Sequence, residues 1–212
     1  MAKTPAQAAV DTLLEGLASL MKERGFRKDA RTFRRTTEEG VVHVINFQMS
    51  AYGTAVEGRF AVNLGVFIPE VHAHFHPDAA TKKVHVVDCV ISERLAMLDG
   101  ANLDVWWNTS SSVASLEDVS KRLRAHGFPY LDSFASRSQI IQAIRDSDYE
   151  LASMLHPRIV AAIMLVKGGR LDEASAIMRT GIELAEKANR PSEVFHLRSE
   201  ARALGIDTSL LP

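Results

Sequence analysis

Cysteine is almost absent from this chain of 212 residues, and its single thiol, Cys89, has no internal partner for a disulfide. Cys89 lies in the apolar run Val84–Ile91, where a small buried hydrophobe is expected and no neighbouring cation would lower its pKa. Long apolar runs are also lacking, since none approaches the roughly 20 residues that a membrane-spanning helix needs. We therefore expect a fold without disulfides, in a reducing compartment.

An excess of either charge is lacking as well. The chain has 25 Lys and Arg against 26 Asp and Glu, a formal net charge of −1, which argues against nucleic-acid binding through the overall field. Asp11 and Glu15 interrupt the apolar stretch that a secretory signal would need. These absences predict a cytoplasmic protein that does not enter a membrane.

Signatures of catalysis are missing too. No Ser, Thr or Cys lies in a nucleophile-elbow motif, and Gly168-Gly169 lacks the third glycine and the preceding strand of a dinucleotide-binding loop. The carboxylates are scattered without an evident pair. The sequence therefore favours a protein that is not an enzyme.

The residues that are present predict a helix followed by strands. Thr4 is suited to cap a helix that begins at Pro5 and ends at Gly25, with apolar residues every three or four positions. The spacing then changes to two in Val41–Met49 and Arg59–Ile68, as in strands. Short connections imply a mainly antiparallel sheet with the first helix on one face. Further strand candidates are Arg31–Thr36, Glu70–His76, Val84–Leu95 and Asp104–Asn108.

After Asn108 the pattern becomes helical. Ser115 is a candidate N-cap for a helix from Leu116 to about Ala125, and the helices around Gly168-Gly169 resemble a single tetratricopeptide-like hairpin. Strands early and helices late predict an α+β fold, with a sheet domain over residues 1–135 and a helical tail over 136–212. The helices expected in the tail are Ser136–Arg145, Asp148–Leu155, Arg158–Lys167, Leu171–Ala188 and Ser192–Leu204.

Six short motifs follow one another along the first domain: Gly25-Phe26, Arg31-Thr32-Phe33-Arg34-Arg35, Val44-Ile45-Asn46-Phe47-Gln48, Arg59-Phe60-Ala61-Val62-Asn63-Leu64-Gly65-Val66, Arg94-Leu95 and Trp106-Trp107. Their order resembles a bacterial family catalogued as domain of unknown function 4304. The similarity covers about residues 8–135 and leaves the helical tail outside. It implies an α+β domain in a bacterial cytoplasm, and it implies no activity or catalytic residues, because none is assigned to the family.

Polar residues on the strand sides opposite the apolar rows form the first candidate site. If the strands pair, their amides and guanidinium groups converge on one surface that can hold a small polar or anionic ligand or a protein partner. The alternative is an internal network beneath the tail helices. Of the adjacent Trp106 and Trp107, one is expected in the core, and the other beneath the tail or exposed as an anchor. The set comprises Asn46, Gln48, Arg59, Asn63 and Arg94.

The second candidate is a row of histidines. On a strand, His72, His74 and His76 would project from one side about 7 Å apart, and two of them could converge on a zinc ion. Asp78 or His85 could complete such a site. The alternative is a solvated strand face or loop.

The third candidate is a basic stretch from Lys22 to Arg35, with seven cations against Glu23 and Asp29. Such a stretch suits phosphate groups or an acidic protein partner. The alternative is a solvated face that nearby glutamates neutralise in part.

Together these patterns predict a non-enzymatic binding module without a cofactor, such as an immunity protein or a regulatory adaptor, whose partner is a protein or a small polar or anionic ligand. The alternative is a small metal-dependent hydrolase that uses His72, His74 and His76 to hold zinc. Nucleic-acid binding through the basic stretch is not favoured.

Overall fold

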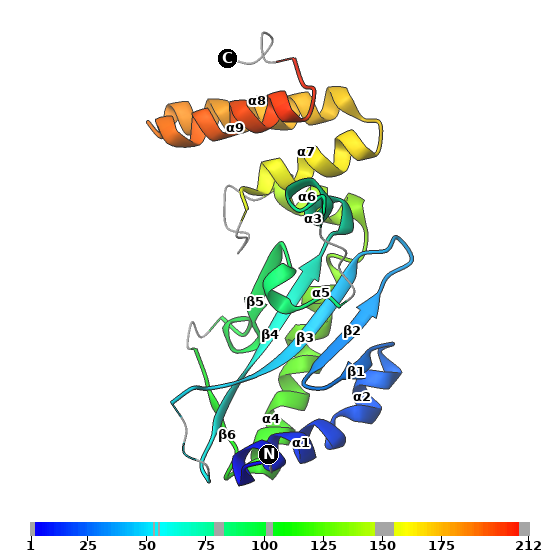
Figure 1. Cartoon of the computed structure of the whole chain (residues 1–212), viewed down its shortest axis with the longest axis vertical. Helices are drawn as coiled ribbons and strands as arrows, with labels where there is room; N and C mark the ends of the chain where they lie inside the picture. Colours follow the sequence, from blue (N-terminus) through cyan, green and yellow to red (C-terminus); the bar gives the residue numbers. More distant parts are fainter. Residues whose placement is uncertain are drawn as a thin grey trace. The chain divides into compact units, whose positions relative to one another are not determined.

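The computed structural model describes residues 3–52, 54, 56–78, 83–100, 104–146 and 155–207 (Figure 1). The chain divides into two compact units. The sheet unit comprises residues 1–67 and 81–135, and the helical unit comprises residues 68–80 and 136–212. Residues 68–80, which the sequence analysis assigned to the sheet domain, therefore belong with the tail.

The described part of the sheet unit contains six strands that form one antiparallel sheet, as predicted. The strand order is β1-β2-β3-β4-β5, and β6 pairs with β4 along the same edge as β5. The strands are β1 (Arg27–Asp29), β2 (Thr32–Thr36), β3 (Val42–Met49), β4 (Arg59–Phe67), β5 (Ile91–Arg94) and β6 (Trp107–Asn108).

Helices cover one face of this sheet. Figure 1 shows α4 and α5 behind β3 and β4, and α1 packs against α4. The face between them is apolar because alternate residues of each strand, such as Phe33, Phe47 and Phe60, point into it and are buried. The helical segments are α1 (Pro5–Gly16), α2 (Ala18–Glu23), α4 (Ser112–Arg122), a π-helical turn η3 (Leu123–Gly127) and α5 (Phe128–Asp132).

Within the described part of the sheet unit, residues 84–90 cover one end of the reverse face of the sheet. There Cys89 packs with Val44, Phe67 and Val84 in a second, smaller apolar cluster. Gly65 makes this contact possible, because a Cβ at that position would lie 2.6 Å from the Cys89 sulfur. The reverse face is therefore apolar where residues 84–90 cover it and polar beyond them.

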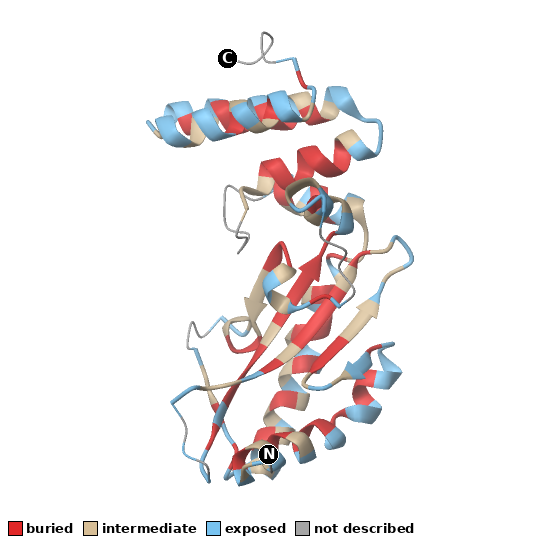
Figure 2. Cartoon of the chain, viewed as in Figure 1, coloured by how far each residue is buried: buried red, intermediate tan, exposed pale blue. Residues whose placement is uncertain are grey.

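The helical unit is built from α3 (Pro69–Phe75), α6 (Arg137–Asp146), α7 (Pro157–Lys167), α8 (Leu171–Lys187) and α9 (Pro191–Ala203). Figure 2 shows α7 buried along most of its length, because α3, α6 and α8 pack around it. No helix among the described residues has the length and apolar character to cross a bilayer.

The sequence predicted the start of the first helix correctly. Thr4 caps α1, and its hydroxyl and the Gln7 side chain exchange hydrogen bonds with each other's backbone amides. The expected single helix is divided at Leu17 into α1 and α2, and Gly25 follows with a positive φ of 78°.

Three expectations were wrong. Glu70–His76 is not a strand but the helix α3, which begins at Pro69 with Glu70 in its first turn, both favourable there. In Val84–Leu95 only Ile91–Arg94 is a strand, because residues 86–88 form a 3₁₀ turn, η1, over the Cys89 cluster.

The third error concerns Ser115. It is not an N-cap but lies inside α4, where its hydroxyl donates to the Asn108 carbonyl. The helix expected at Asp148–Leu155 lies outside the described residues except for Leu155.

Candidate functional site

The polar row of the reverse face follows from strand register. Asn46 of β3 pairs with Thr32 of β2 and Asn63 of β4, and Asn63 pairs with Arg94 of β5. Directly opposite residues share a face of the sheet. These side chains therefore form one line across four strands, which periodicity alone could not place in register.

Hydrogen bonds fix the amides of this row. Asn46 Nδ2 donates to Thr32 Oγ1, and Asn63 Nδ2 donates to Gln48 Oε1, each at 2.9 Å. Within the described residues, nothing donates to the Oδ1 atoms of Asn46 and Asn63, and the Gln48 amino group has no acceptor. Since Gln48 is exposed and both asparagines are half-buried, these groups remain available to a partner.

Arg94 ends the row beside an aromatic ring. Its guanidinium lies 4.8 Å from the centre of the Trp106 ring, a cation–π distance. Asp104 holds both residues: its carboxylate lies 3.3 Å from Arg94 Nη1 and accepts from the Trp106 indole at 3.3 Å. Nη1 is buried without a well-aligned hydrogen bond, so the ion pair with Asp104 and the contact with the Trp106 ring orient the guanidinium.

The structure thus brings together four of the five predicted residues, Asn46, Gln48, Asn63 and Arg94. The fifth, Arg59, is exposed at the start of β4, four residues from Asn63 and so about 13 Å along the strand. We call the four residues, together with Arg59 and Trp106, the open sheet face.

The neighbouring tryptophan lies elsewhere. Trp107 is buried, stacks on Phe60 with 5.8 Å between ring centres, and donates from its indole to Asp118 at 2.8 Å. Trp107 is therefore the core residue of the pair, and Trp106 is the half-exposed one.

The row of three histidines does not form, because the segment is helical. His72 on α3 and His76, which follows the last residue of α3, are one turn apart, with ring centres 5.0 Å from each other. His74 projects differently and its Nε2 lies 3.2 Å from Glu200 of α9. No group of three or more metal-ligating side chains is present among the described residues. The zinc site was predicted from the geometry of a strand, and this segment is not a strand.

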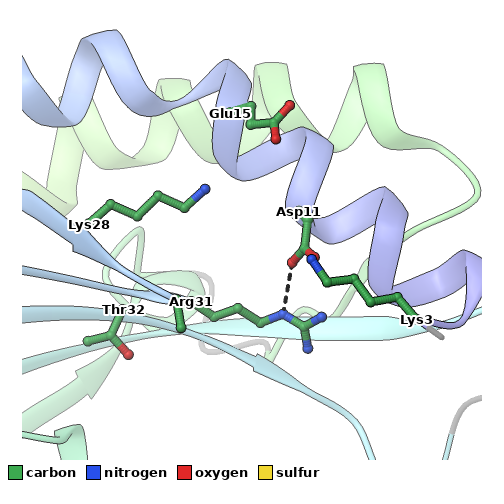
Figure 3. Close-up of a pocket in the computed structure, with 7 residues that line it drawn as sticks. Lys3, Asp11, Glu15, Lys28, Arg31 and Thr32 are labelled. Atoms are coloured by element: carbon green, nitrogen blue, oxygen red, sulfur yellow. Dashed lines mark hydrogen bonds and ion pairs between the residues drawn. The ribbon is translucent and has the colours of Figure 1, made fainter. Parts of the chain in front are cut away.

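Aspartate side chains form ion pairs with several cations of the basic stretch. Arg31 pairs with Asp11 at 3.2 Å, and Arg34 pairs with Asp29 at 3.0 Å. Figure 3 shows Arg31 and Asp11 in an open pocket of about 580 Å³ between α1 and the β1–β2 turn, with Lys28 reaching in from β1. The sequence pointed to glutamates as neutralising groups, whereas these aspartates supply the ion pairs.

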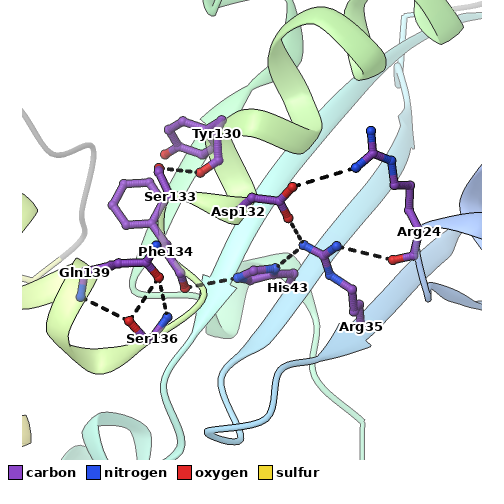
Figure 4. Close-up of polar contacts among 9 residues, drawn as sticks. All are labelled: Arg24, Arg35, His43, Tyr130, Asp132, Ser133, Phe134, Ser136 and Gln139. Carbon is purple, nitrogen blue, oxygen red and sulfur yellow. Dashed lines mark hydrogen bonds and ion pairs between the residues drawn. The ribbon is translucent and has the colours of Figure 1, made fainter.

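A partly buried network that the sequence did not reveal joins β2, β3 and α5 (Figure 4). Arg35 donates to Asp132 and, at 2.9 Å, to His43 Nδ1. Because arginine only donates, Nδ1 accepts, and the proton is on Nε2, which donates to the Phe134 carbonyl at 3.1 Å. Burial lowers the pKa of His43 to about 4, so the imidazole is neutral near pH 7.

The Cys89 thiol is shielded from solvent, as predicted. Cys89 is buried, and desolvation, followed by the nearby Asp88 carboxylate, raises the pKa of its thiol far above the ordinary value. Cys89 therefore serves the packing of the reverse face.

Comparison with known proteins identifies a family over part of the chain, which comprises most of the sheet unit together with residues 68–80 of the helical unit. The family model described as "Domain of unknown function (DUF4304)" matches residues 17–133, more than half of the 212 residues. No curated protein and no solved structure matches the chain.

Proposed function

Because residues 17–133 match its model, the chain belongs to the DUF4304 family, whose description gives no activity, and we propose that it is a non-enzymatic binding module. In this proposal the open sheet face holds a protein partner, as it would in an adaptor or an immunity protein. The observation that carries the proposal is the Arg94–Trp106 pair at the end of a row of amides with unused hydrogen-bonding groups.

The composition of the face supports a protein partner. Trp and Arg are the residue types that most often dominate binding energy at interfaces, and here Asp104 holds one of each in place. A side chain ordered before binding loses less entropy when the partner arrives. The amides of Asn46, Gln48 and Asn63 would then select a partner with complementary polar groups.

Charge favours an acidic contact. The Arg59 side chain is exposed and makes no hydrogen bond or ion pair with any described residue, and Arg94 is only partly neutralised at the surface by Asp104. A carboxylate on the partner could therefore pair with either guanidinium. Affinity should fall moderately as salt screens these contacts.

The test is a comparison of partner capture. The tagged full chain and its Arg94→Ala and Trp106→Ala variants would be used to purify bound proteins from the native cell. Arg179→Ala is the matched control, because Arg179 is exposed on α8 in the other unit. One protein should be retained by the wild type and the control, and its measured Kd should weaken about 30-fold or more in either face variant.

Circular dichroism and tryptophan or tyrosine fluorescence would first establish that each variant is folded. Equal capture by all four proteins, or equal loss in the Arg179→Ala control, would show that the open sheet face is not the binding surface.

A further inference from the structure

A second pocket is lined only by residues of the helical unit. It is distinct from the open sheet face, which belongs to the sheet unit. It has a volume of about 500 Å³, within the range of small-molecule sites. Three helices form its wall: α6 contributes Arg145, α7 contributes Arg158, and α8 contributes Glu173, Ile177, Thr180 and Leu184.

Arg158 is the unusual member of this wall. The residue is only 5% exposed, yet its guanidinium makes no hydrogen bond or ion pair with any residue that the structure describes. The backbone amide of Arg158 donates to His156 Nδ1 at 3.2 Å, which leaves the guanidinium without a partner among the described residues. Burying an arginine without an anion is costly, and side chains in this position are normally paired.

The fold makes room for this arginine. Gly181 lies in the middle of α8, and a Cβ there would lie 2.8 Å from Arg158 Cδ. Glycine inside a helix is less favourable than alanine. A small residue at this position therefore lets the stem of Arg158 pass between α7 and α8 and reach the pocket.

Glu173 does not serve as the missing partner. Its carboxylate accepts from Arg145 at 2.9 Å and from Arg170 at 2.6 and 2.7 Å. Hydrogen bonds first from Arg170 and then from Arg145 lower the pKa of Glu173 to about 2. Two guanidinium groups already share this one carboxylate, so among the described residues that line the pocket the positive charge of Arg158 is left uncompensated.

We propose that this pocket binds a small monocarboxylate with an aliphatic body. The fork of the Arg158 guanidinium would accept the carboxylate oxygens in a bidentate pair. Ile177 and Leu184 would pack against the alkyl part, and the exposed Thr180 lies at the opening. One uncompensated cation matches a single negative charge better than a phosphate dianion.

Calorimetric titration of the full chain with hexanoate tests the proposal. We expect saturable binding with a Kd of about 1 mM or tighter, and no binding of hexanol or hexylamine, which keep the alkyl body but lack the carboxylate. Inorganic phosphate should bind at least about tenfold more weakly than hexanoate.

Two variants locate the site. Arg158→Gln removes the charge, and Gly181→Ala pushes the arginine stem from its place; each should weaken hexanoate binding at least about tenfold. Arg179→Gln, which removes an exposed charge from the same helix α8, should leave the affinity unchanged. If Arg158→Gln does not fold, the hexanoate affinities of Gly181→Ala and Arg145→Gln are compared with that of the wild type instead.

Absence of hexanoate binding to the wild type, equal binding of hexanol, or an affinity that none of the site variants changes would each overturn the proposal. Because the pocket and the open sheet face lie in different units, the variants that test one site leave the other intact.

Discussion

Acidification is expected to destabilise the sheet unit through one buried imidazole, His43. The folded unit holds this ring neutral, with Nδ1 accepting from Arg35 and Nε2 donating to Phe134. A proton on Nδ1 would face the Arg35 guanidinium and would have no acceptor. The unfolded chain can take up that proton freely, so lower pH favours unfolding.

The magnitude follows from the pKa of His43, which falls from 6.5 to about 4 on folding. Because the folded pKa is the lower one, the stabilisation is fully present above pH 6.5 and is lost as the pH falls toward 4. Each pKa unit corresponds to about 1.4 kcal/mol, so the free energy of unfolding should drop by about 2 kcal/mol at about pH 5 and by roughly 3 kcal/mol at about pH 4.

Urea unfolding followed by tryptophan fluorescence measures this effect in the correct unit. The chain has two tryptophans, Trp106 and Trp107, and both lie in the sheet unit. His43→Gln is the matched variant, because glutamine can accept from Arg35 and donate to Phe134 without titrating. Contributions from Asp11 and Asp29, whose pKa values are lowered by Lys3 and Lys83 respectively, cancel in the difference between the two proteins.

The wild type should therefore lose about 2 kcal/mol more than His43→Gln between about pH 8 and about pH 5. Parallel pH profiles for the two proteins would refute the reasoning. So would a nuclear magnetic resonance titration of the His43 ring in the folded protein with a midpoint near 6.5, the ordinary value.

Other predictions concern packing and backbone. Gly65→Ala should lower the free energy of unfolding by about 1–3 kcal/mol, because the new Cβ meets the Cys89 sulfur, and adding Cys89→Ala should restore part of that loss in the same urea assay. The Cys89 thiol should react with a disulfide reagent only at the rate at which the sheet unit opens, so a fast reaction in native buffer would contradict its burial. Ala30→Gly should raise the urea midpoint, by about 0.5–1 kcal/mol in stability, because Ala30 has a φ of 52° in the β1–β2 turn; an unchanged or lower midpoint would contradict this account.

Periodicity was sufficient for the strands at the centre of the sheet. Alternation in Arg59–Ile68 predicted β4 almost to its ends, and the α+β order of strands before helices is confirmed. The same alternation assigned Asn46 and Asn63 to the sides of their strands away from the apolar rows. The alternation could not show that Asn46 and Asn63 lie opposite each other. Register depends on how two strands pair, and the spacing of residues within one strand does not determine that pairing.

The histidine segment shows where spacing is ambiguous. Val71 and Phe75 are four residues apart, which suits one face of a helix as well as one face of a strand. Two signals could have identified the helix. Pro69 is favourable at the start of a helix, and Glu70 is favourable in its first turn.

Buried polar residues were the least predictable features. His43 lies in an apolar row of β3, and its contacts Asp132 and Phe134 are about ninety residues away in sequence. Arg158 likewise lies in the first turn of the apolar helix α7, and Gly181, which makes room for its side chain, lies on the next helix. No local pattern encodes such long-range partners.

The lateral borders of the sheet have a consequence for how any partner must attach. β1 has three residues, and the opposite border of β4 is shared between β5 with four residues and β6 with two. Strands this short offer too few free main-chain groups in a line for a peptide to extend the sheet. Specific recognition by this unit would therefore depend on its side chains, so that point substitutions could switch partner choice while the backbone stays the same.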